Sequence, residues 1–550
     1  MRILLPKASK GVKFDLLLTL DMNDFDVEML LPSLFHLVRT KGRRVGKPID
    51  PDLYEEYFGR MIQHPRLKGF DTHSGRTLLD RWVRTSIVRM GKRGRAHTGE
   101  KMTYLYPTTM LSYKAGLPKE ITRLRGVHNF VYTVLLSVEK DPVKLDRLFR
   151  SALGEGLVLD DSQSFDGRYD GNTEIDIEAL LTISFLDGLP AAGVSALPSE
   201  IKSFPRLVKQ SEFFAHDVLK TLKCFQKELP TTLLTRFLLS LINFHLFVYS
   251  MRLMNWVIRV AGGGNGRSGG PDIYLDCTGE RGSYSDELAR TCVERDLETL
   301  ERYVRASLRL RTLDRFVTSS NLKAGLPDRD TQTEDYLKRL LELASEVRIQ
   351  ARADQEFEQI CAENGLNMNE TTEEHEMTEA AVYLRDLRDS SDADSLDRLV
   401  RVLFEAQRTS AMKNVTGWFY STSGFNRAYG VISGNSKGAR RVARYTLSNE
   451  ILATLVHVAL ADHGWEEHGR FVPAVRLPLR EFLVWLERRY GLLIGRPPAA
   501  ETSAEAVEAA RRNLEAMKIR LRQIGVFQNL SDDFDAQYLQ RPTIDLAEVV

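Results

Sequence analysis

The apolar positions of the chain are most concentrated in residues 230–271, where a long hydrophobic run leads into a glycine-rich loop. Thr231 can cap a helix and Gly262 is the next break, so this pattern predicts a helix of about thirty residues, roughly 45 Å long. Its uncharged part covers only residues 237–251 and has an arginine at each edge, whereas a membrane-spanning helix needs roughly 20 apolar residues. We therefore expect a buried core helix and no contact with a membrane.

Two polar residues inside this run, Asn243 and His245, are expected to be a hydrogen-bonded pair in the core and not ligands. The loop that follows is GGGNGRSGG, which lacks the Gly-Lys-Ser/Thr ending of a phosphate-binding loop. It also follows a helix, whereas both nucleotide-binding fingerprints follow a strand. The loop is therefore predicted to be a flexible connector.

Further elements are predicted between residues 126 and 392, in a mixed region followed by a helical one. The run VHNFVYTVLLSV, residues 127–138, fits either a strand or a buried helix. A short strand is predicted at residues 273–275 and a long helix from Ser285, which has two acidic residues in its first turn. A T-x-x-E capping box at residues 331–334 predicts a further long helix that ends at about Cys361.

The last quarter of the chain predicts a small module of helices and strands. Residues 415–435 alternate aromatic and small side chains, which suggests a short hairpin. Three amphipathic helices follow: the first is capped by Ser448 or Asn449, the second starts near Pro478, and the third starts at another T-x-x-E box. The final stretch is typical of a β-hairpin, and three helices followed by a hairpin form a winged helix. We expect this module at about residues 446–542.

The third helix of this module is the candidate DNA reader, because its polar side is basic. The basic residues on it are Arg511, Arg512, Lys518, Arg520 and Arg522. Arg511, Lys518 and Arg522 are spaced i, i+7 and i+11, so they are expected to form one stripe suited to a phosphate-lined groove. Further candidates just before the first helix are Arg440, Arg441 and Arg444. The predicted wing tip, residues 531–535, is acidic and would repel phosphates.

Charge is balanced over the whole chain but not locally. The 550 residues include 76 Lys and Arg against 75 Asp and Glu, so overall charge gives no argument for nucleic acid. Residues 39–101, here called the N-terminal basic segment, contain sixteen Lys and Arg but seven Asp and Glu. Its two densest clusters include Arg43, Arg44, Lys92, Arg93 and Arg95. Such a segment fits a contact with the nucleic-acid backbone, and the alternatives are a docking site for an acidic partner protein and a solvated basic face.

Motifs for catalysis or metal binding are not evident in the sequence. The four cysteines form no C-x-x-C pair and the histidines form no H-E-x-x-H, so no zinc site, disulfide framework or cofactor is predicted. The acidic stretch at residues 160–176 does not fit the EF-hand pattern. Asp276 and Cys277 at the end of a predicted strand are a candidate active site, but no nearby histidine supplies a base. The N-terminus shows no signal peptide, which favours a cytoplasmic protein.

Three stretches resemble accessory proteins of bacterial phage-defence islands. They are CVERDLETLERYVRASLRLRTLDRF, GNSKGARRVARYTLSNEILATLVHVAL and GVFQNLSDDFDAQYLQRP. The chain looks like a component of the methylation-associated defence system and, more distantly, like the phosphorothioation-dependent restriction proteins. The resemblance implies a non-catalytic subunit that works beside a methyltransferase, an ATPase or a nuclease.

Together these observations predict a mainly α, multidomain protein with a C-terminal winged helix. The length suggests about three or four domains, which we place at residues 1–125, 126–270, 271–392 and 393–550. The first is basic, the second contains the apolar helix, the third is helical with an acidic linker, and the fourth contains the winged helix. The predicted function is DNA binding or scaffolding in a defence system. The alternatives are a protein scaffold without DNA contact and a metal-dependent nuclease.

Overall fold

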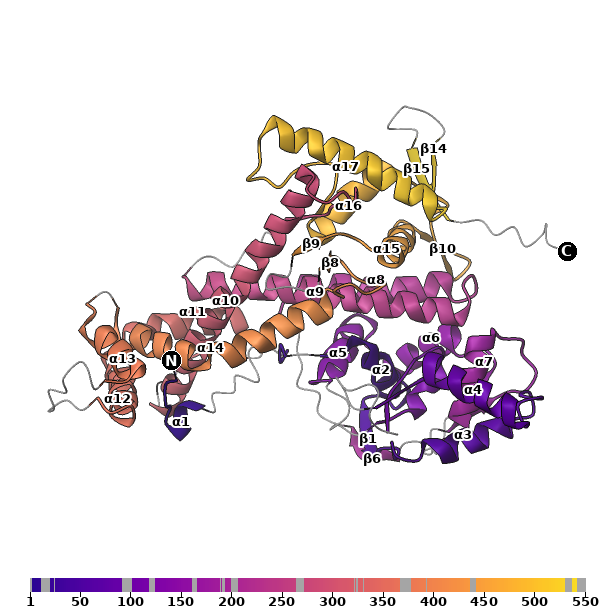
Figure 1. Cartoon of the computed structure of the whole chain (residues 1–550), viewed down its shortest axis with the longest axis horizontal. Helices are drawn as coiled ribbons and strands as arrows, with labels where there is room; N and C mark the ends of the chain where they lie inside the picture. The colour runs from indigo at the N-terminus through magenta and orange to yellow at the C-terminus, as the bar shows by residue number, and fades with distance from the viewer. Residues whose placement is uncertain are drawn as a thin grey trace. The chain divides into compact units, whose positions relative to one another are not determined.

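A computed structural model describes most of the 550-residue chain. The described residues are 2–10, 20–23, 25–91, 101–117, 124–160, 166–187, 189, 193–198, 206–263, 272–320, 322, 325–329, 331–366, 377–391, 393–435, 442–529 and 537–541. Helices predominate among them and the strands are short, which confirms the prediction of a mainly helical protein (Figure 1).

The chain forms two compact units, each assembled from three segments. Unit 1 consists of Met1–Asn23, Ser250–Pro271 and Glu294–Phe419, and unit 2 consists of Asp24–Tyr249, Asp272–Val293 and Tyr420–Val550. Three of the five boundaries fall inside long helices: α9 (Thr231–Ala261), α10 (Tyr284–Ser319) and α14 (Ser395–Thr422). The four consecutive domains that we expect from the sequence stay a prediction.

Unit 1 contains helical segments only, within the described residues. Besides its parts of α9, α10 and α14, it includes α1 (Lys7–Lys10), α11 (Thr333–Glu342), η3 (Leu343–Ser345), α12 (Val347–Glu363) and α13 (Glu379–Asp389). The single helix expected from the capping box to Cys361 is wrong, because η3 separates α11 from α12. The backbone of Glu346 is extended, with φ −62° and ψ 134°, so a continuous helix cannot pass through this residue.

The first segment of unit 2 combines helices with short antiparallel strand pairs. Its helices are η1 (Val27–Met29), α2 (Leu30–Arg39), α3 (Tyr54–Ile62), α4 (His73–Ser86), η2 (Met110–Lys114), α5 (Val127–Glu139), α6 (Pro142–Leu153), α7 (Ile177–Asp187) and α8 (Val208–Phe225). Its strands are β1 (Arg43–Lys47), β2 (Val88–Met90), β3 (Met102–Leu105), β4 (Leu157–Leu159), β5 (Gly167–Tyr169) and β6 (Gly193–Pro198), paired β1 with β6, β2 with β3 and β4 with β5. The ambiguous run at residues 127–138 is helical, and α5 packs against α2 and α8.

The apolar helix α9 is a core helix, as expected. Although it is long enough to cross a bilayer, 83% of its most apolar 18-residue window is buried inside the protein. Asn243 and His245 are both buried. We expected them to bond to each other, but each one bonds to a different residue. The Asn243 amide donates to the carbonyl of Thr422 at 2.7 Å, and His245 bonds to Asp217 on α8 at 2.9 Å. The two side chains therefore connect α9 to different parts of unit 2.

The last segment of unit 2 contains three helices, α15 (Asn449–Asp462), α16 (Leu479–Tyr490) and α17 (Ala504–Gln523) (Figure 1). Its strands are β8 (Ile432–Gly434), β9 (Ala443–Tyr445), β10 (Trp465–Glu467), β11 (Arg470–Val472), β12 (Arg476–Pro478), β13 (Leu492–Leu493), β14 (Phe527–Asn529) and β15 (Gln537–Gln540). Strands β12, β15 and β14 form one sheet in that order, with antiparallel neighbours. The expected hairpin at residues 415–435 is wrong in its first half, because α14 continues to Thr422 and buries Trp418 and Phe419.

One parallel strand pair connects distant segments of unit 2. Strand β7 (Ile273–Tyr274) pairs with β13, so that Ile273 lies opposite Leu492. The buried amide of Asn513 on α17 reinforces this connection, because it donates to the carbonyl of Leu275 at 2.7 Å and accepts the backbone N–H of Cys277 at 2.7 Å. Residues 272–278 are therefore part of the same core as α17.

Candidate nucleic-acid interface

The exposed arginines on α17 are already paired with a glutamate of the same helix. The side chains of Arg511 and Arg512 are 72% and 75% exposed. Their Nε atoms lie 2.9 Å and 3.1 Å from the carboxylate of Glu508, and hydrogen bonds from both arginines lower the pKa of Glu508 to about 2. A phosphate that approached here would have to compete with this carboxylate.

Lys518 does not extend the expected basic stripe. It is only 7% exposed, and its Nζ lies 2.8 Å from Glu515. A straight α-helix drifts by about 20° over seven residues, which turns position 518 from the exposed face that Arg511 occupies toward the buried edge next to Met517. Lys518 therefore does not lie on an exposed stripe with Arg511 and Arg522, and the expectation of a continuous stripe is wrong at this residue.

The remaining arginines of α17 support the fold of the C-terminal segment. Arg520 donates to the carbonyl of Leu447 and, at 3.0 Å, to the side chain of Asn449, so it connects α17 to the start of α15. The guanidinium of Arg522 lies 5.6 Å from the ring centre of Phe527 on β14. The exposed and half-buried positions of α17 carry four arginines (511, 512, 520 and 522) and three glutamates (505, 508 and 515), so its charges nearly balance.

Arg444, expected to contact DNA, is used inside the fold. It lies on β9 with its side chain 18% exposed, and it holds two fully buried carboxylates. The distances are 2.8 Å to Asp286 and 3.5 Å to Asp276. Its charge compensates these carboxylates, so the expectation that it is available to phosphates is wrong. The neighbouring candidates Arg440 and Arg441, like the acidic residues 531–535, lie outside the described residues.

The carboxylate and thiol of the candidate active site are buried structural groups. Asp276 is fully buried and accepts the Thr278 hydroxyl at 2.6 Å and the Ser285 hydroxyl at 3.1 Å, which fixes the loop between β7 and α10. Burial raises the pKa of the Cys277 thiol to about 12, so the thiol is protonated at neutral pH. Among the described residues, no group of three His, Cys, Asp or Glu side chains could hold a metal ion.

Described carboxylates of the acidic stretch at residues 160–176 act locally. Asp170 accepts the backbone N–H groups of Asn172 and Thr173 at 2.8 Å and 3.0 Å. Asp176 caps the first turn of α7 through the N–H of Ala179 at 2.8 Å and accepts the Thr232 hydroxyl at 2.6 Å. These two residues shape turns and helix ends, as the failed EF-hand match suggests.

The N-terminal basic segment presents a more open set of cations. Arg43 and Arg44 lie on β1, where Arg43 is half-buried and Arg44 is exposed. Lys41 and Lys47, on either side of them, are exposed and make no ion pair with any described carboxylate. The clustered residues Lys92, Arg93 and Arg95 lie outside the described residues.

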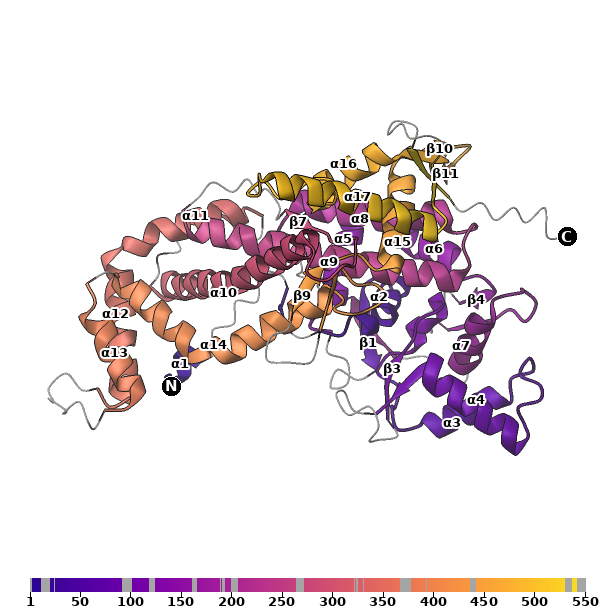
Figure 2. The same cartoon turned by 45° about the horizontal axis from the view of Figure 1, so that its top comes forward.

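Helix α4 is the most exposed element of this segment. It lies beside α3 in both views (Figure 1, Figure 2), and only Leu79 and Val83 are buried. Its N-terminus is capped by Thr72, whose hydroxyl accepts the N–H of Gly75 at 3.1 Å. The rest of its surface is open to solvent and mostly polar or basic, with one exposed apolar side chain, Leu78, at 61%.

The ion pairs on α4 leave two arginines free of carboxylates. Asp80 binds Arg84 at 2.9 Å and accepts the Tyr54 hydroxyl at 2.9 Å, so its charge is compensated. Arg76 and Arg81 are exposed and form no ion pair with the described carboxylates. A single turn residue, Ile87, separates α4 from β2. The hairpin of β2 and β3 is closed by the N–H of Gly91, which donates to the carbonyl of Lys101 at 2.9 Å.

Comparison with known families decides the identity of the chain. A family model described as methylation-associated defense system protein MAD7 matches residues 7–542. The chain belongs to the MAD7 family. No curated protein and no solved structure matches it. Membership of the MAD7 family confirms the resemblance to the methylation-associated defence system, and it makes this MAD7 protein a component of a multi-protein system whose other members are its natural partners.

In this MAD7 protein the structure separates two groups of basic residues that look alike in the sequence. Most of the described C-terminal candidates are paired with carboxylates or backbone carbonyls, whereas Arg76 and Arg81 on α4 are not. Arg76 and Arg81 belong to the N-terminal basic segment but are not among the candidate residues predicted from the sequence. The sequence feature that could have identified Arg76 and Arg81 is the i, i+4 spacing of Asp80 and Arg84. This spacing predicts that the one acidic residue of α4 is already paired with Arg84 and leaves the other arginines without a carboxylate on their own helix.

Proposed function

We propose that this MAD7 protein is a non-catalytic, cytoplasmic subunit of a methylation-associated defence system that contacts DNA through the N-terminal basic segment. The observation that carries the proposal is the pair of exposed arginines, Arg76 and Arg81, on a helix without a free carboxylate. Arginine side chains that are not tied to carboxylates can bind phosphates without first losing an ion pair. A methyltransferase, an ATPase or a nuclease of the same system would then act on the DNA that this subunit holds.

We further propose that the C-terminal segment is a winged helix. Its support is the order α15, β12, α16, α17, β14 and β15, together with a sheet in which β15 lies between β12 and β14. This order of helices and strands is typical of winged helices. In such a module α17 takes the position of the reading helix, yet its charges nearly balance.

The second candidate function, a protein scaffold, is favoured by that same face of α17. Besides its paired charges, the helix exposes two branched apolar side chains, Val507 at 56% and Ile519 at 52%. Paired charges around exposed apolar groups suit a protein partner better than a phosphate backbone. In one form of this proposal, the winged helix holds a partner protein while α4 contacts DNA. In the other form, the whole chain is a protein scaffold that does not contact DNA.

The test is a fluorescence-anisotropy titration of the full-length protein with a mixed-sequence duplex at low and moderate salt. The variant Arg76→Gln/Arg81→Gln is compared with Arg511→Gln/Arg512→Gln, which removes the same charge from α17. We expect wild-type binding to weaken steeply with salt, and the α4 variant to bind about 10-fold to 100-fold more weakly with a salt slope lower by about 2. The α17 variant should bind as wild type.

Two outcomes would contradict this assignment. If wild type does not bind DNA at low salt, the scaffold without DNA contact becomes the better account. If both double variants lose the same affinity, the effect comes from total charge and not from α4. Circular dichroism of each variant checks that its helical content is unchanged.

A further inference from the structure

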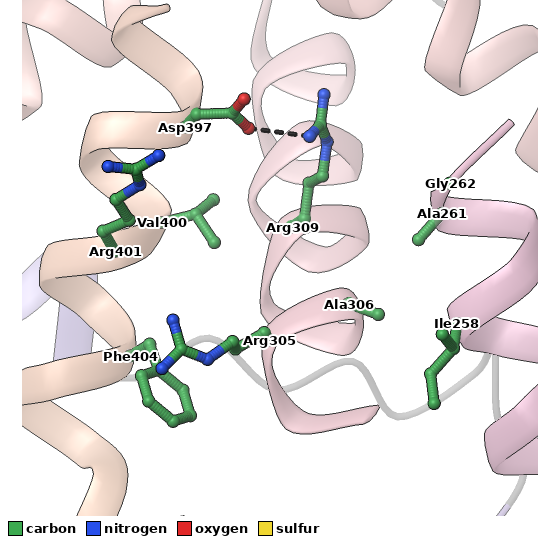
Figure 3. A pocket seen from close by; sticks show the side chains of 10 residues that line it. All are labelled: Ile258, Ala261, Gly262, Arg305, Ala306, Arg309, Asp397, Val400, Arg401 and Phe404. Atoms are coloured by element: carbon green, nitrogen blue, oxygen red, sulfur yellow. Dashed lines mark ion pairs between the residues drawn. The ribbon is translucent and has the colours of Figure 1, made fainter. Parts of the chain in front are cut away.

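A second basic site lies in unit 1, far in sequence from the N-terminal basic segment. It is a hollow of about 340 Å³ that is lined by one face of α10, one face of α14 and the C-terminal end of α9 (Figure 3). Helix α10 contributes Arg305 and Arg309, which are one turn apart, and α14 contributes Asp397 and Arg401, also one turn apart. All of these residues belong to unit 1.

The hollow contains more positive than negative charge. Three arginines line it and Asp397 is the one acidic residue among the lining side chains. Arg309 binds Asp397 at 2.7 Å, so this pair is neutral (Figure 3). Arg305 and Arg401 provide the remaining two charges. Arg305 also forms an ion pair with Glu301 at 2.8 Å. Both side chains of this pair are partly exposed to water, so the pair contributes little free energy.

Donor groups in the hollow are available to a ligand. Arg401 is exposed and forms no hydrogen bond or ion pair with any described residue. Arg309 is paired with Asp397, so Arg401 is the donor of the hollow that a ligand can reach without first breaking an ion pair. The ring of Phe404 holds the Arg305 guanidinium 4.0 Å from its centre, so this arginine keeps its position when the site is empty.

The walls of the hollow are apolar. Ile258 and Ala261 line it on the α9 side, and Val400 lines it on the α14 side next to Asp397 and Arg401 (Figure 3). Sites for small organic ligands have volumes of about 300–1,000 Å³ and combine apolar walls with a few polar groups. The hollow is at the small end of this range, which suits one nucleotide and not a duplex.

We propose that this hollow binds a nucleoside phosphate, with the phosphate held by Arg305, Arg309 and Arg401 and the nucleoside against the apolar wall. The lining side chains carry a net charge of +2, three arginines against Asp397, with Glu301 paired to Arg305 outside the lining. This lining charge matches a phosphate monoester, which carries about −1.5 to −2 at neutral pH, better than a single carboxylate. Guanidinium groups bind phosphate oxygens through two parallel hydrogen bonds. The inference does not depend on the DNA contact proposed for unit 2, because it uses different residues.

The test is isothermal titration calorimetry of the full-length protein with AMP, with inorganic phosphate and with a single-stranded oligonucleotide. The informative variant is Arg401→Gln, because Arg401 is exposed and its loss should not affect folding. Its matched control is Lys413→Gln, which removes an exposed charge from the same helix outside the hollow. We expect saturable binding of AMP by wild type and by Lys413→Gln, and binding at least tenfold weaker for Arg401→Gln.

Each other outcome would overturn the proposal. Equal losses in the two variants would mean that AMP responds to overall charge. Inorganic phosphate that binds as tightly as AMP would remove the nucleoside from the site. An oligonucleotide that binds through Arg401 when AMP does not bind would assign the hollow to a nucleic-acid strand. If none of the three probes gives a saturable heat of binding, the hollow does not bind phosphate ligands.

Discussion

The imidazole of His245 and the carboxylate of Asp217 form a hydrogen bond of 2.9 Å with both side chains fully buried. The same carboxylate accepts the hydroxyl of Tyr490 at 2.6 Å and the Nε of Arg489 at 3.1 Å. Although burial raises it, the hydrogen bonds and charges of His245 and Arg489 lower the pKa of Asp217 overall. One carboxylate thus connects α8, α9 and α16.

Removal of this carboxylate charge should destabilise unit 2 strongly. We expect Asp217→Asn to lower the free energy of unfolding by about 3–5 kcal/mol, because it removes the more buried of the two carboxylates, Asp217 and Asp462, that compensate the charge of Arg489. Urea denaturation followed by circular dichroism measures the loss. Asp71→Asn, at an exposed position, is the matched control and should change stability by less than about 0.5 kcal/mol. Equal stability of the two variants would mean that the network contributes nothing.

Arg444 should affect stability and not DNA affinity. Arg444→Gln leaves the buried carboxylates of Asp276 and Asp286 without their shared cation, and we expect a loss of about 2–4 kcal/mol. At a temperature where the variant is folded, its affinity for a DNA duplex should equal that of wild type. Thermal unfolding and anisotropy on the same sample separate the two effects. A stable variant that binds DNA more weakly would restore Arg444 as a phosphate contact.

The thiols should be unreactive in the folded protein. All four cysteines are buried, and burial raises the pKa of Cys277 to about 12 and that of Cys224 and Cys361 to about 11. Since the thiolate is the reactive form, we expect no thiol to react with Ellman's reagent at pH 8 in native protein, and four to react in guanidinium chloride. Rapid reaction of one thiol, lost in Cys277→Ser, would support a nucleophilic role for Cys277.

The stability of the protein should depend on pH through His36. This residue is 3% exposed, and burial lowers the pKa of its imidazole from 6.5 to about 4. The unfolded chain therefore binds a proton between these values and the folded chain does not, so the stabilisation is complete above pH 6.5 and is lost as pH falls toward 4. From pH 7 to pH 5 the contribution of His36 should fall by roughly 2 kcal/mol.

A comparison of wild type with His36→Gln isolates this contribution, because glutamine does not titrate. The difference in free energy of unfolding between the two proteins, measured in urea, should shift in favour of His36→Gln as pH falls from 7 to 5. A difference that stays constant over this range would show that His36 is protonated equally in both states.

The helical elements were predictable where a local signal agrees with packing. Ser448 caps α15 through the N–H of Ile451, as expected, and Gly491 ends α16 in the left-handed conformation, with φ 78°. The alternation of aromatic and small side chains after residue 415 suggested a strand, but packing favours a helix there. Helix α14 continues to Thr422 because Trp418 and Phe419 are buried on it. Strand β7 was predicted from a short apolar run, but its pairing with β13 was not, because residues 273 and 492 are far apart in the chain and no local pattern encodes their contact.

The candidate site was less predictable than the fold, because charge in a sequence does not reveal its partners. Arg444 and Asp286 are far apart in the chain and meet only in the folded protein, so the basic cluster that precedes α15 looked available. Lys518 turned inward through the angular drift of the helix, which a stripe drawn by spacing ignores. The hollow between Arg309 and Arg401 combines helices from different parts of the chain and left no sequence motif.

The pairing of Ile273 with Leu492 also determines when unit 2 can be completed during protein synthesis. A ribosome adds about 5–20 residues per second, so β7 emerges on the order of tens of seconds before its partner exists. Until residue 449 is made, the buried surface of α8 also lacks α15, which packs on it. A chain that ends prematurely before residue 449 would keep this apolar surface exposed to chaperones and proteases. The core of unit 2 therefore closes only after the last quarter of the chain has been synthesised.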